Sequence, residues 1–331
     1  MSNQIRNLIL AVITLAFVAG CGGSGGNDGN PNPIFETGEL VTITSDNATT
    51  VAGVVAEQAL EDNLFGALTS SGLPVMSAGS GAAIALTSLS AVPLPPNMLG
   101  AQSTLQNCAN GGSVDVTVDV SNPLMISRND EFTFEFNVCD EGTGSVLNGG
   151  IVMTVTGFEG DPSGETFFLG MRMELSAFSV TQGGDVTAAS GTISVEIDST
   201  MPPITTITVS TTGLATTHNG VTETMTSMTV TVTENDGTVP SSVSVETSFR
   251  ISSPRLGGDV IVSTSVSLQS SGDGYPFTGE LMIQAADNTA IVFIALDSNM
   301  VRLEIYIDGD DVPDEILDVT WDELLAAADA A

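Results

Sequence analysis

Residues 114–120 read VDVTVDV and residues 132–138 read FTFEFNV, and in both stretches apolar side chains alternate with polar ones. Successive side chains of a strand point to opposite faces of a sheet, so a period of two predicts strands with one buried and one solvated face. The same alternation returns at residues 169–175, 193–197, 243–251, 260–268 and 301–307. The chain is therefore predicted to be mainly β.

Short runs rich in Gly, Asn and Asp separate these stretches, for example Asn148-Gly149, Gly183-Gly184-Asp185 and Asn219-Gly220. Such residues adopt the positive φ angles that tight hairpin turns need. Since no helical pattern interrupts the series, we expect about a dozen strands in an antiparallel meander. A sheet with one apolar face must curl or be covered, which predicts a curved, half-barrel or barrel-like sheet.

Two helices are predicted beside this sheet. Asp46 and Asn47 are candidate caps for a moderately amphipathic helix over residues 48–68, expected to pack in or across the concave side of the sheet. At the other end, Thr320-Trp321-Asp322-Glu323 has the pattern of a capping box and predicts a short closing helix. The first helix combines an apolar and a polar side, formed by Val51, Val55, Leu60, Leu64 and Leu68 and by Glu57, Glu61 and Asp62 respectively.

The charge of the chain is strongly one-sided. Its 331 residues include 40 acidic residues and only six cationic ones, all of them arginines. Such a polyanion is repelled by nucleic-acid phosphates and by anionic lipid surfaces, so nucleic acid is not an expected partner. Divalent cations and cationic partners remain compatible with this charge, but solubility, in salty surroundings for instance, is the simpler explanation.

The N-terminus carries the most specific motif. Residues 1–7 are polar and contain Arg6, and Leu8–Ala19 is an apolar run interrupted only by Thr14. A helix of this length spans about 18 Å, which is too short for the ~30 Å hydrocarbon core and typical of a signal peptide. The run ends in Val18-Ala19-Gly20-Cys21, which resembles the lipobox of bacterial lipoproteins.

This resemblance implies cleavage before Cys21 and a membrane lipid anchor on its sulfur, with diacylglycerol and a further acyl chain such as palmitate. Gly22, in place of the Asp that retains such proteins in the inner membrane, implies lipid anchoring to the outer membrane, facing the periplasm or the cell exterior. Residues 22–33 read GGSGGNDGNPNP, a composition that predicts a flexible tether. The alternative is an ordinary secretory signal followed by a chance cysteine.

Cys108 and Cys139 are predicted to form a disulfide. Pairing around the turn at residues 121–130 places residues near 112 opposite Cys139, so a small loop brings Cys108 across. An exported protein lies in a compartment that permits the bond. Two free thiols are the alternative.

The densest carboxylate cluster is a weak calcium candidate, because hard oxygen ligands suit Ca²⁺. An EF-hand loop does not fit, since Val312 and Pro313 stand where an acid and a glycine are needed and Val319 stands at position twelve. An acidic hairpin turn between residues 301–307 and 317–321 is favoured. The cluster comprises Asp308, Asp310, Asp311 and Asp314, with Glu315 beside them.

No catalytic constellation stands out. His218 is the single histidine, and one histidine is too few for a histidine-rich zinc site. It lies beside a predicted turn, and no serine in the sequence is distinguished as an activated nucleophile that could pair with it. The sequence has no phosphate-binding loop, and no cofactor is predicted. The methionines that alternate in the strand stretches are expected to fill the core, although methionine-rich surfaces also bind varied apolar ligands.

The predicted organisation is a signal peptide over residues 1–20, a lipidated cysteine and tether over 21–40, a helical and irregular segment over 41–100, and an antiparallel β domain with a closing helix over 101–331. The strand series and its ending resemble poorly characterised β-rich envelope lipoproteins, without an assigned activity. We expect a non-enzymatic binding or structural module that holds an apolar ligand or a partner protein. The alternatives are an integral outer-membrane β-barrel and a carboxylate-dependent hydrolase.

Overall fold

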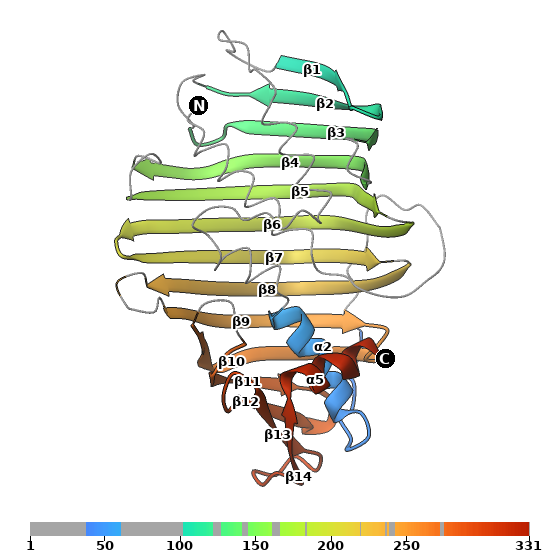
Figure 1. Cartoon of the computed structure of the whole chain (residues 1–331), viewed down its shortest axis with the longest axis vertical. Coiled ribbons are helices and arrows are strands. Elements are labelled where there is room, and N and C mark those ends of the chain that lie inside the picture. Colours follow the sequence, from blue (N-terminus) through green and yellow to red (C-terminus); the bar gives the residue numbers. More distant parts are fainter. Residues whose placement is uncertain are drawn as a thin grey trace. The chain divides into compact units, whose positions relative to one another are not determined.

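The computed structural model describes residues 38–60, 102–121, 127–140, 145–160, 166–182, 184–218, 220–235, 237, 242–271 and 275–330. The predicted fold class is confirmed, because 69% of the described residues are strand and the strands form one open antiparallel meander. Figure 1 shows the strand order, which follows the sequence from β1 to β14 without a crossover.

The chain divides into two compact units. Unit 1 contains β1 (Gln102–Asn107), β2 (Gly111–Asp119), β3 (Glu131–Asp140), β4 (Ser145–Gly160), β5 (Phe167–Gln182) and β6 (Asp185–Met201). Strand β7 (Ile204–His218) contributes residues to both units. Unit 2 contains α2 (Ala48–Leu60), β8 (Val221–Asn235), β9 (Ser242–Ser253), β10 (Gly258–Ser270), β11 (Thr278–Gln284), the 3₁₀ helix η1 (Ala286–Asn288), β12 (Ala290–Ala295), β13 (Met300–Tyr306), β14 (Glu315–Thr320) and α5 (Trp321–Asp329).

The strands of unit 1 alternate buried and exposed side chains as their sequence predicts. Met173 of β5 lies opposite Met153 of β4, and both are buried. On the neighbouring strand, Ile193 lies opposite Met173 and is also buried. Methionine and branched aliphatic side chains therefore fill much of the inner face, together with phenylalanines such as Phe136 and Phe178.

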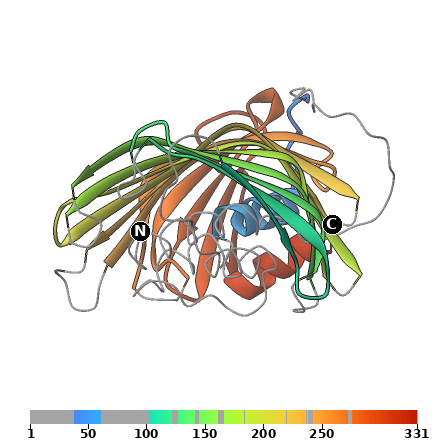
Figure 2. The ribbon, with the colours of Figure 1, turned by 90° about the horizontal axis from the view of Figure 1, so that it is seen from above.

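A row of β-bulges bends the strands of unit 1, which arch in Figure 2. Each bulge adds a residue to one strand and increases the local twist. Gly112, with a φ angle of 74°, faces Val138, with a φ angle of 46°. Gly149, with a φ angle of 87°, faces Ala177, with a φ angle of 45°. A Cβ on Gly149 would lie 2.2 Å from the carbonyl oxygen of Ala177, so the close approach of these two strands requires glycine at this position.

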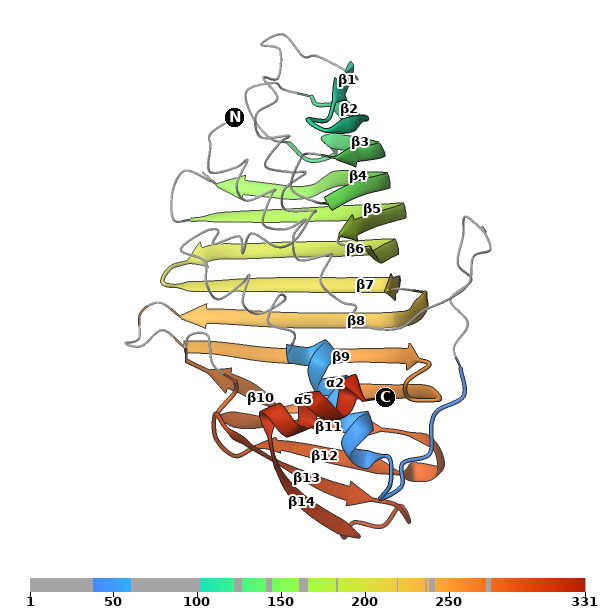
Figure 3. The same cartoon turned by 45° about the vertical axis from the view of Figure 1, so that its right-hand side comes forward.

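In unit 2, α2 and α5 lie side by side on the inner face of the sheet (Figures 2 and 3). This confirms that the N-terminal helix packs on the sheet. Its apolar residues Val51, Ala52, Val54, Val55 and Ala56 are all buried and surround most of the helix, and of its predicted polar residues only Glu57 lies in the described part. The predicted continuation of this helix over residues 61–68 lies outside the described residues.

The predicted closing helix is confirmed in detail. The side chain of Thr320 accepts a hydrogen bond from Glu323 N, and the side chain of Glu323 accepts from Thr320 N, which completes the capping box. Trp321 is buried, stacks on Tyr275 with ring centroids 5.2 Å apart, and donates from Nε1 to the carbonyl oxygen of Asp297. The start of α5 is thus fixed to two loops of unit 2.

Candidate functional site

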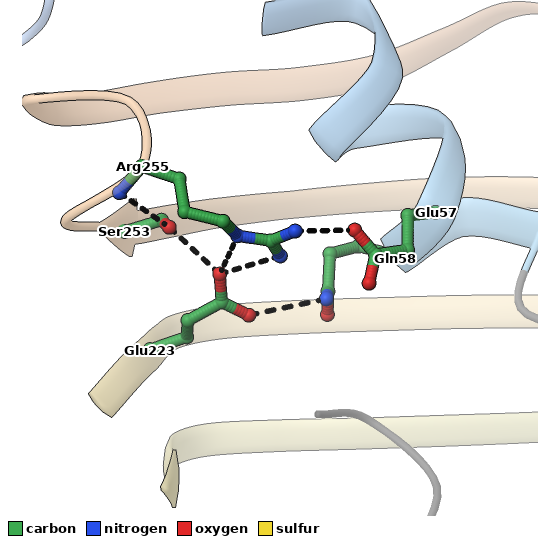
Figure 4. Close-up of polar contacts among 5 residues, drawn as sticks. All are labelled: Glu57, Gln58, Glu223, Ser253 and Arg255. Atoms are coloured by element: carbon green, nitrogen blue, oxygen red, sulfur yellow. Dashed lines mark hydrogen bonds and ion pairs between the residues drawn. The ribbon is translucent and has the colours of Figure 1, made fainter. Parts of the chain in front are cut away.

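A buried polar cluster lies in unit 2, between α2 and the sheet (Figure 4). Glu57 and Gln58 come from the last turn of α2, and Glu223 comes from the start of β8. Ser253 ends β9, and Arg255 lies in the turn that follows. We call these five residues the arginine cluster.

The guanidinium of Arg255 holds the cluster together. Its Nη1 donates to Glu57 Oε2 at 2.6 Å, while Nη2 and Nε donate to Glu223 Oε1 at 2.7 and 2.9 Å. Ser253 Oγ donates to the same Glu223 oxygen, and Gln58 Nε2 donates to Oε2 of Glu223 at 3.2 Å. Both carboxylate oxygens of Glu223 therefore accept hydrogen bonds from the protein itself.

Burial makes these contacts strong. The side chains of Arg255, Glu57 and Glu223 are 10%, 11% and 7% exposed. Burial by itself lowers the pKa of Arg255, but attraction to Glu223 and hydrogen bonds to both carboxylates outweigh it and raise the pKa above its ordinary value. The cation is thus held in its charged form, and it joins α2 to β8 and to the β9–β10 turn.

This geometry favours a structural clamp over a catalytic pair. A carboxylate that acts as a general acid or nucleophile must reach a substrate within hydrogen-bond distance. Here both carboxylates bind one guanidinium between a helix and a sheet, and the Glu223 oxygens are occupied as described. The predicted polar side of the helix is corrected at Glu57, which faces Arg255 rather than solvent.

A second arginine fixes the segment before α2. Arg250 of β9 donates from Nε to Asp259 Oδ2 and from Nη2 to the carbonyl oxygen of Gly38, both at 2.8 Å. Asp259 is completely buried, and its Oδ1 has no hydrogen-bond partner in the described structure. A Cβ on Gly38 would lie 2.6 Å from that oxygen, so only glycine fits beside the buried carboxylate.

The predicted disulfide between Cys108 and Cys139 is confirmed, with the two Cα atoms 5.4 Å apart. Gly111 pairs with Asp140 and Ser113 pairs with Asn137, which matches the predicted register to within one residue. The bond links β3 to the loop before β2, next to the row of bulges.

The carboxylates of the acidic turn bind backbone amides of the turn itself. Asp308 Oδ1 accepts from Asp310 N, Asp310 Oδ1 accepts from Val312 N, and Asp314 Oδ2 accepts from Ile307 N. The turn joins β13 to β14, as the favoured prediction had it, and Asp311 lies within it. The described residues contain no group of three or more His, Cys, Asp or Glu side chains arranged to hold a metal ion.

The other predicted sites fall as follows. Cys21 and the tether that follows it lie outside the described residues. His218 is the last residue of β7, directly before Asn219-Gly220, where the sequence predicted a turn. Among the helices of the described ranges, none is both long and apolar enough to cross a membrane.

The arginine cluster and the Arg250–Asp259 pair were not predicted. One signal was available: the chain has only six arginines, and two of them stand five residues apart around one predicted hairpin turn. In a chain so rich in carboxylates, a rare cation inside a β-hairpin favours a buried ion pair.

No family model, curated protein or solved structure matches this chain.

Proposed function

We propose that this chain is a lipoprotein of the bacterial cell envelope, anchored to the outer membrane through acyl chains on Cys21. Its folded part would serve as a non-enzymatic structural or protein-binding module. The observation that carries the proposal is the apolar run Leu8–Ala19 ending in Val18-Ala19-Gly20-Cys21. Small residues before the cysteine suit a peptidase cleft, and several acyl chains give an almost permanent anchor at about 0.8 kcal/mol per buried methylene.

The filled inner face of unit 2 supports a module rather than an open lipid carrier. A carrier needs a concave apolar surface that a ligand can occupy. In unit 2, the inner-face residues Ile283, Phe293 and Leu303 are fully buried, and α2 and α5 occupy that face. In unit 1, Met171 and Met173 are also buried to 2% exposure or less.

The distribution of charge supports a soluble body in an aqueous compartment. Four arginines of the mature chain are paired with carboxylates, namely Arg172, Arg250, Arg255 and Arg302. The mature side chains carry 5 − 40 = −35 charges, because Arg6 is in the signal peptide and every acid follows Cys21. Such a surface favours solubility and disfavours binding to nucleic acid.

Metabolic labelling with palmitate tests the anchor. Labelled palmitate should enter the parent protein and not the Cys21→Ala variant, which should also lose its membrane association. Gly22→Asp is the matched variant, because it keeps the acylated cysteine and should move the labelled protein from the outer to the inner membrane. Equal processing and fractionation of Cys21→Ala and the parent would refute the lipid anchor.

Three further measurements separate the module from its rivals. Native mass spectrometry of the purified body should show no stoichiometric lipid, whereas a carrier retains one. The chain without residues 1–21 should stay in solution without detergent, whereas an integral membrane protein would not. A screen over glycans and esters should show no turnover, whereas a hydrolase would lose its activity on acid-to-amide substitution of its carboxylates.

A further inference from the structure

The strand register of unit 2 places three connections at the same end of its sheet. Gly258 pairs with Ser253 across the β9–β10 turn, and Gln284 pairs with Ala290 across η1. Ala290 in turn pairs with Tyr306, which precedes the acidic turn. We call this end, with the β9–β10 turn, η1 and residues 307–314, the proximal end. The loop of residues 296–299 between β12 and β13 lies at the opposite, distal end.

The N-terminal part of the described chain joins the sheet at the proximal end. Val41 N donates to the carbonyl oxygen of Asp259 at 2.9 Å, and Asp259 N donates to that of Glu39 at 2.9 Å. On the other side, Ala286 N donates to the carbonyl oxygen of Val41 at 2.7 Å. Residues 39–41 are therefore held between β10 and η1, and Arg250 holds Gly38 just before them.

The proposed lipid attachment point is close to this position along the chain. Residues 22–37 separate Cys21 from Gly38. A coil of the composition predicted for this stretch has a root-mean-square span of roughly 20–25 Å. The seven residues of β13 rise about 24 Å between the two ends of unit 2, so the distal end is farther from the anchor by a comparable length.

We propose that the proximal end of unit 2 is the surface that faces the anchoring membrane. The inference rests on the proposed lipidation of Cys21. This end does not adhere to anionic lipid, because its nearby arginines are paired within the protein and the exposed charged side chains are acidic. The exposed acids are Glu39, Asp287, Asp308, Asp310, Asp311 and Asp314.

Energy transfer from the protein to the bilayer tests this orientation. Val312 in the proximal turn and Leu296 in the distal loop are 66% and 43% exposed, so Val312→Cys and Leu296→Cys form a matched pair. The lipidated full chain is purified and reconstituted into phosphatidylcholine vesicles that carry an acceptor dye on a lipid. Only the introduced thiol reacts with a donor dye, because Cys21 is acylated and Cys108–Cys139 is a disulfide.

Transfer should be at least about twofold greater from residue 312 than from residue 296, given a coil span similar to the height of the unit. Equal transfer, or greater transfer from residue 296, overturns the orientation. Failure of the protein to float with the vesicles overturns the lipid anchor itself, and so the two failures are distinguishable.

Added phosphatidylglycerol tests the charge of the proximal end. Transfer from residue 312 should fall in anionic vesicles at low salt, where the Debye length is about 30 Å, and recover at 1 M salt, where it is about 3 Å. An increase in transfer on adding the anionic lipid would mean that this end binds the lipid, and would contradict the proposed repulsion.

Discussion

Arg255 shows how one cation secures a helix in a chain that has few cations to use. Its guanidinium binds Glu57 of α2 and Glu223 of β8, and all three side chains are close to nine-tenths buried. A buried ion pair contributes little net stability relative to apolar residues, but removal of one partner leaves an uncompensated buried charge. The arginine cluster is therefore expected to determine where α2 docks rather than to drive folding.

Arg255→Met tests this role. Loss of the cation leaves two buried carboxylates facing each other, and the free energy of unfolding should fall by about 3–5 kcal/mol in urea titration. The triple variant Glu57→Gln, Glu223→Gln and Arg255→Met removes the charges together and should recover a large part of that loss. Arg302→Met is the matched surface control, because the Arg302–Asp318 pair is solvent-exposed, and it should change stability little. An Arg255→Met protein as stable as the parent would contradict the clamp.

A substitution at Gly149 tests the close contact between β4 and β5 in the row of bulges. Gly149→Ala should lower stability by about 1–3 kcal/mol for the backbone clash, beyond the cost of its positive φ. Gly184→Ala is the matched control, because Gly184 also has a positive φ, of 105°, but a Cβ there meets nothing within 4 Å. Equal losses of stability in the two variants, measured by thermal unfolding, would show that the φ angle alone requires glycine.

Among the elements, α5 carries an acid-sensitive start. The backbone N–H of Thr320 and then its hydroxyl donate to Glu323, and these hydrogen bonds lower the pKa of that carboxyl below its ordinary 4.5. A carboxyl whose pKa is lower in the folded state than in the unfolded state stabilises the folded state at pH values above its ordinary pKa. The contribution is lost as the pH falls through 4.5 and below.

Glu323→Gln checks the sign of this effect. The parent should be more stable than the variant at neutral pH, and the difference should shrink as the pH falls from 5 to about 3. Thr320→Ala is the control that removes the cap at every pH, at a cost of about 0.5–2 kcal/mol. A difference between parent and Glu323→Gln that grows on acidification would contradict the assignment.

The disulfide is the second element-scale constraint. It closes a loop with a sequence separation of 31 residues in unit 1. The chain-entropy model assigns such a loop about 3–4 kcal/mol. Cys108→Ala with Cys139→Ala should lower the unfolding free energy of the protein by about that amount in urea. Treatment of the parent with reductant should reproduce the loss, and stability that is insensitive to both changes would contradict the constraint.

At the scale of the whole molecule, local sequence patterns predicted the helices and strands but not the packing contacts between them. Alternation predicted the strands, and the spacing of Thr320 and Glu323 predicted the cap of α5, because both depend on residues close in sequence. The contact between α2 and α5 depends on Gly53, where a Cβ would lie 2.4 Å from the carbonyl oxygen of Leu324. No local pattern marks that approach.

The arginine cluster was missed for the same reason. Glu57 and Arg255 are separated by 198 positions, and Glu57 occupies a place in the helix where a solvated carboxylate is the ordinary expectation. Only the folded structure places Arg255 next to Glu57. The predicted disulfide succeeded at long range because hairpin register propagates from a turn along both strands.

We propose that Cys21 becomes the N-terminal, acylated residue of an envelope protein. Mass spectrometry of the protein extracted from purified outer membranes tests it most directly. The N-terminal peptide should begin at Cys21 and carry the mass of diacylglycerol plus one further acyl chain. An unmodified N-terminus, or one that begins at any other residue, would contradict the lipid anchor and the orientation inferred from it.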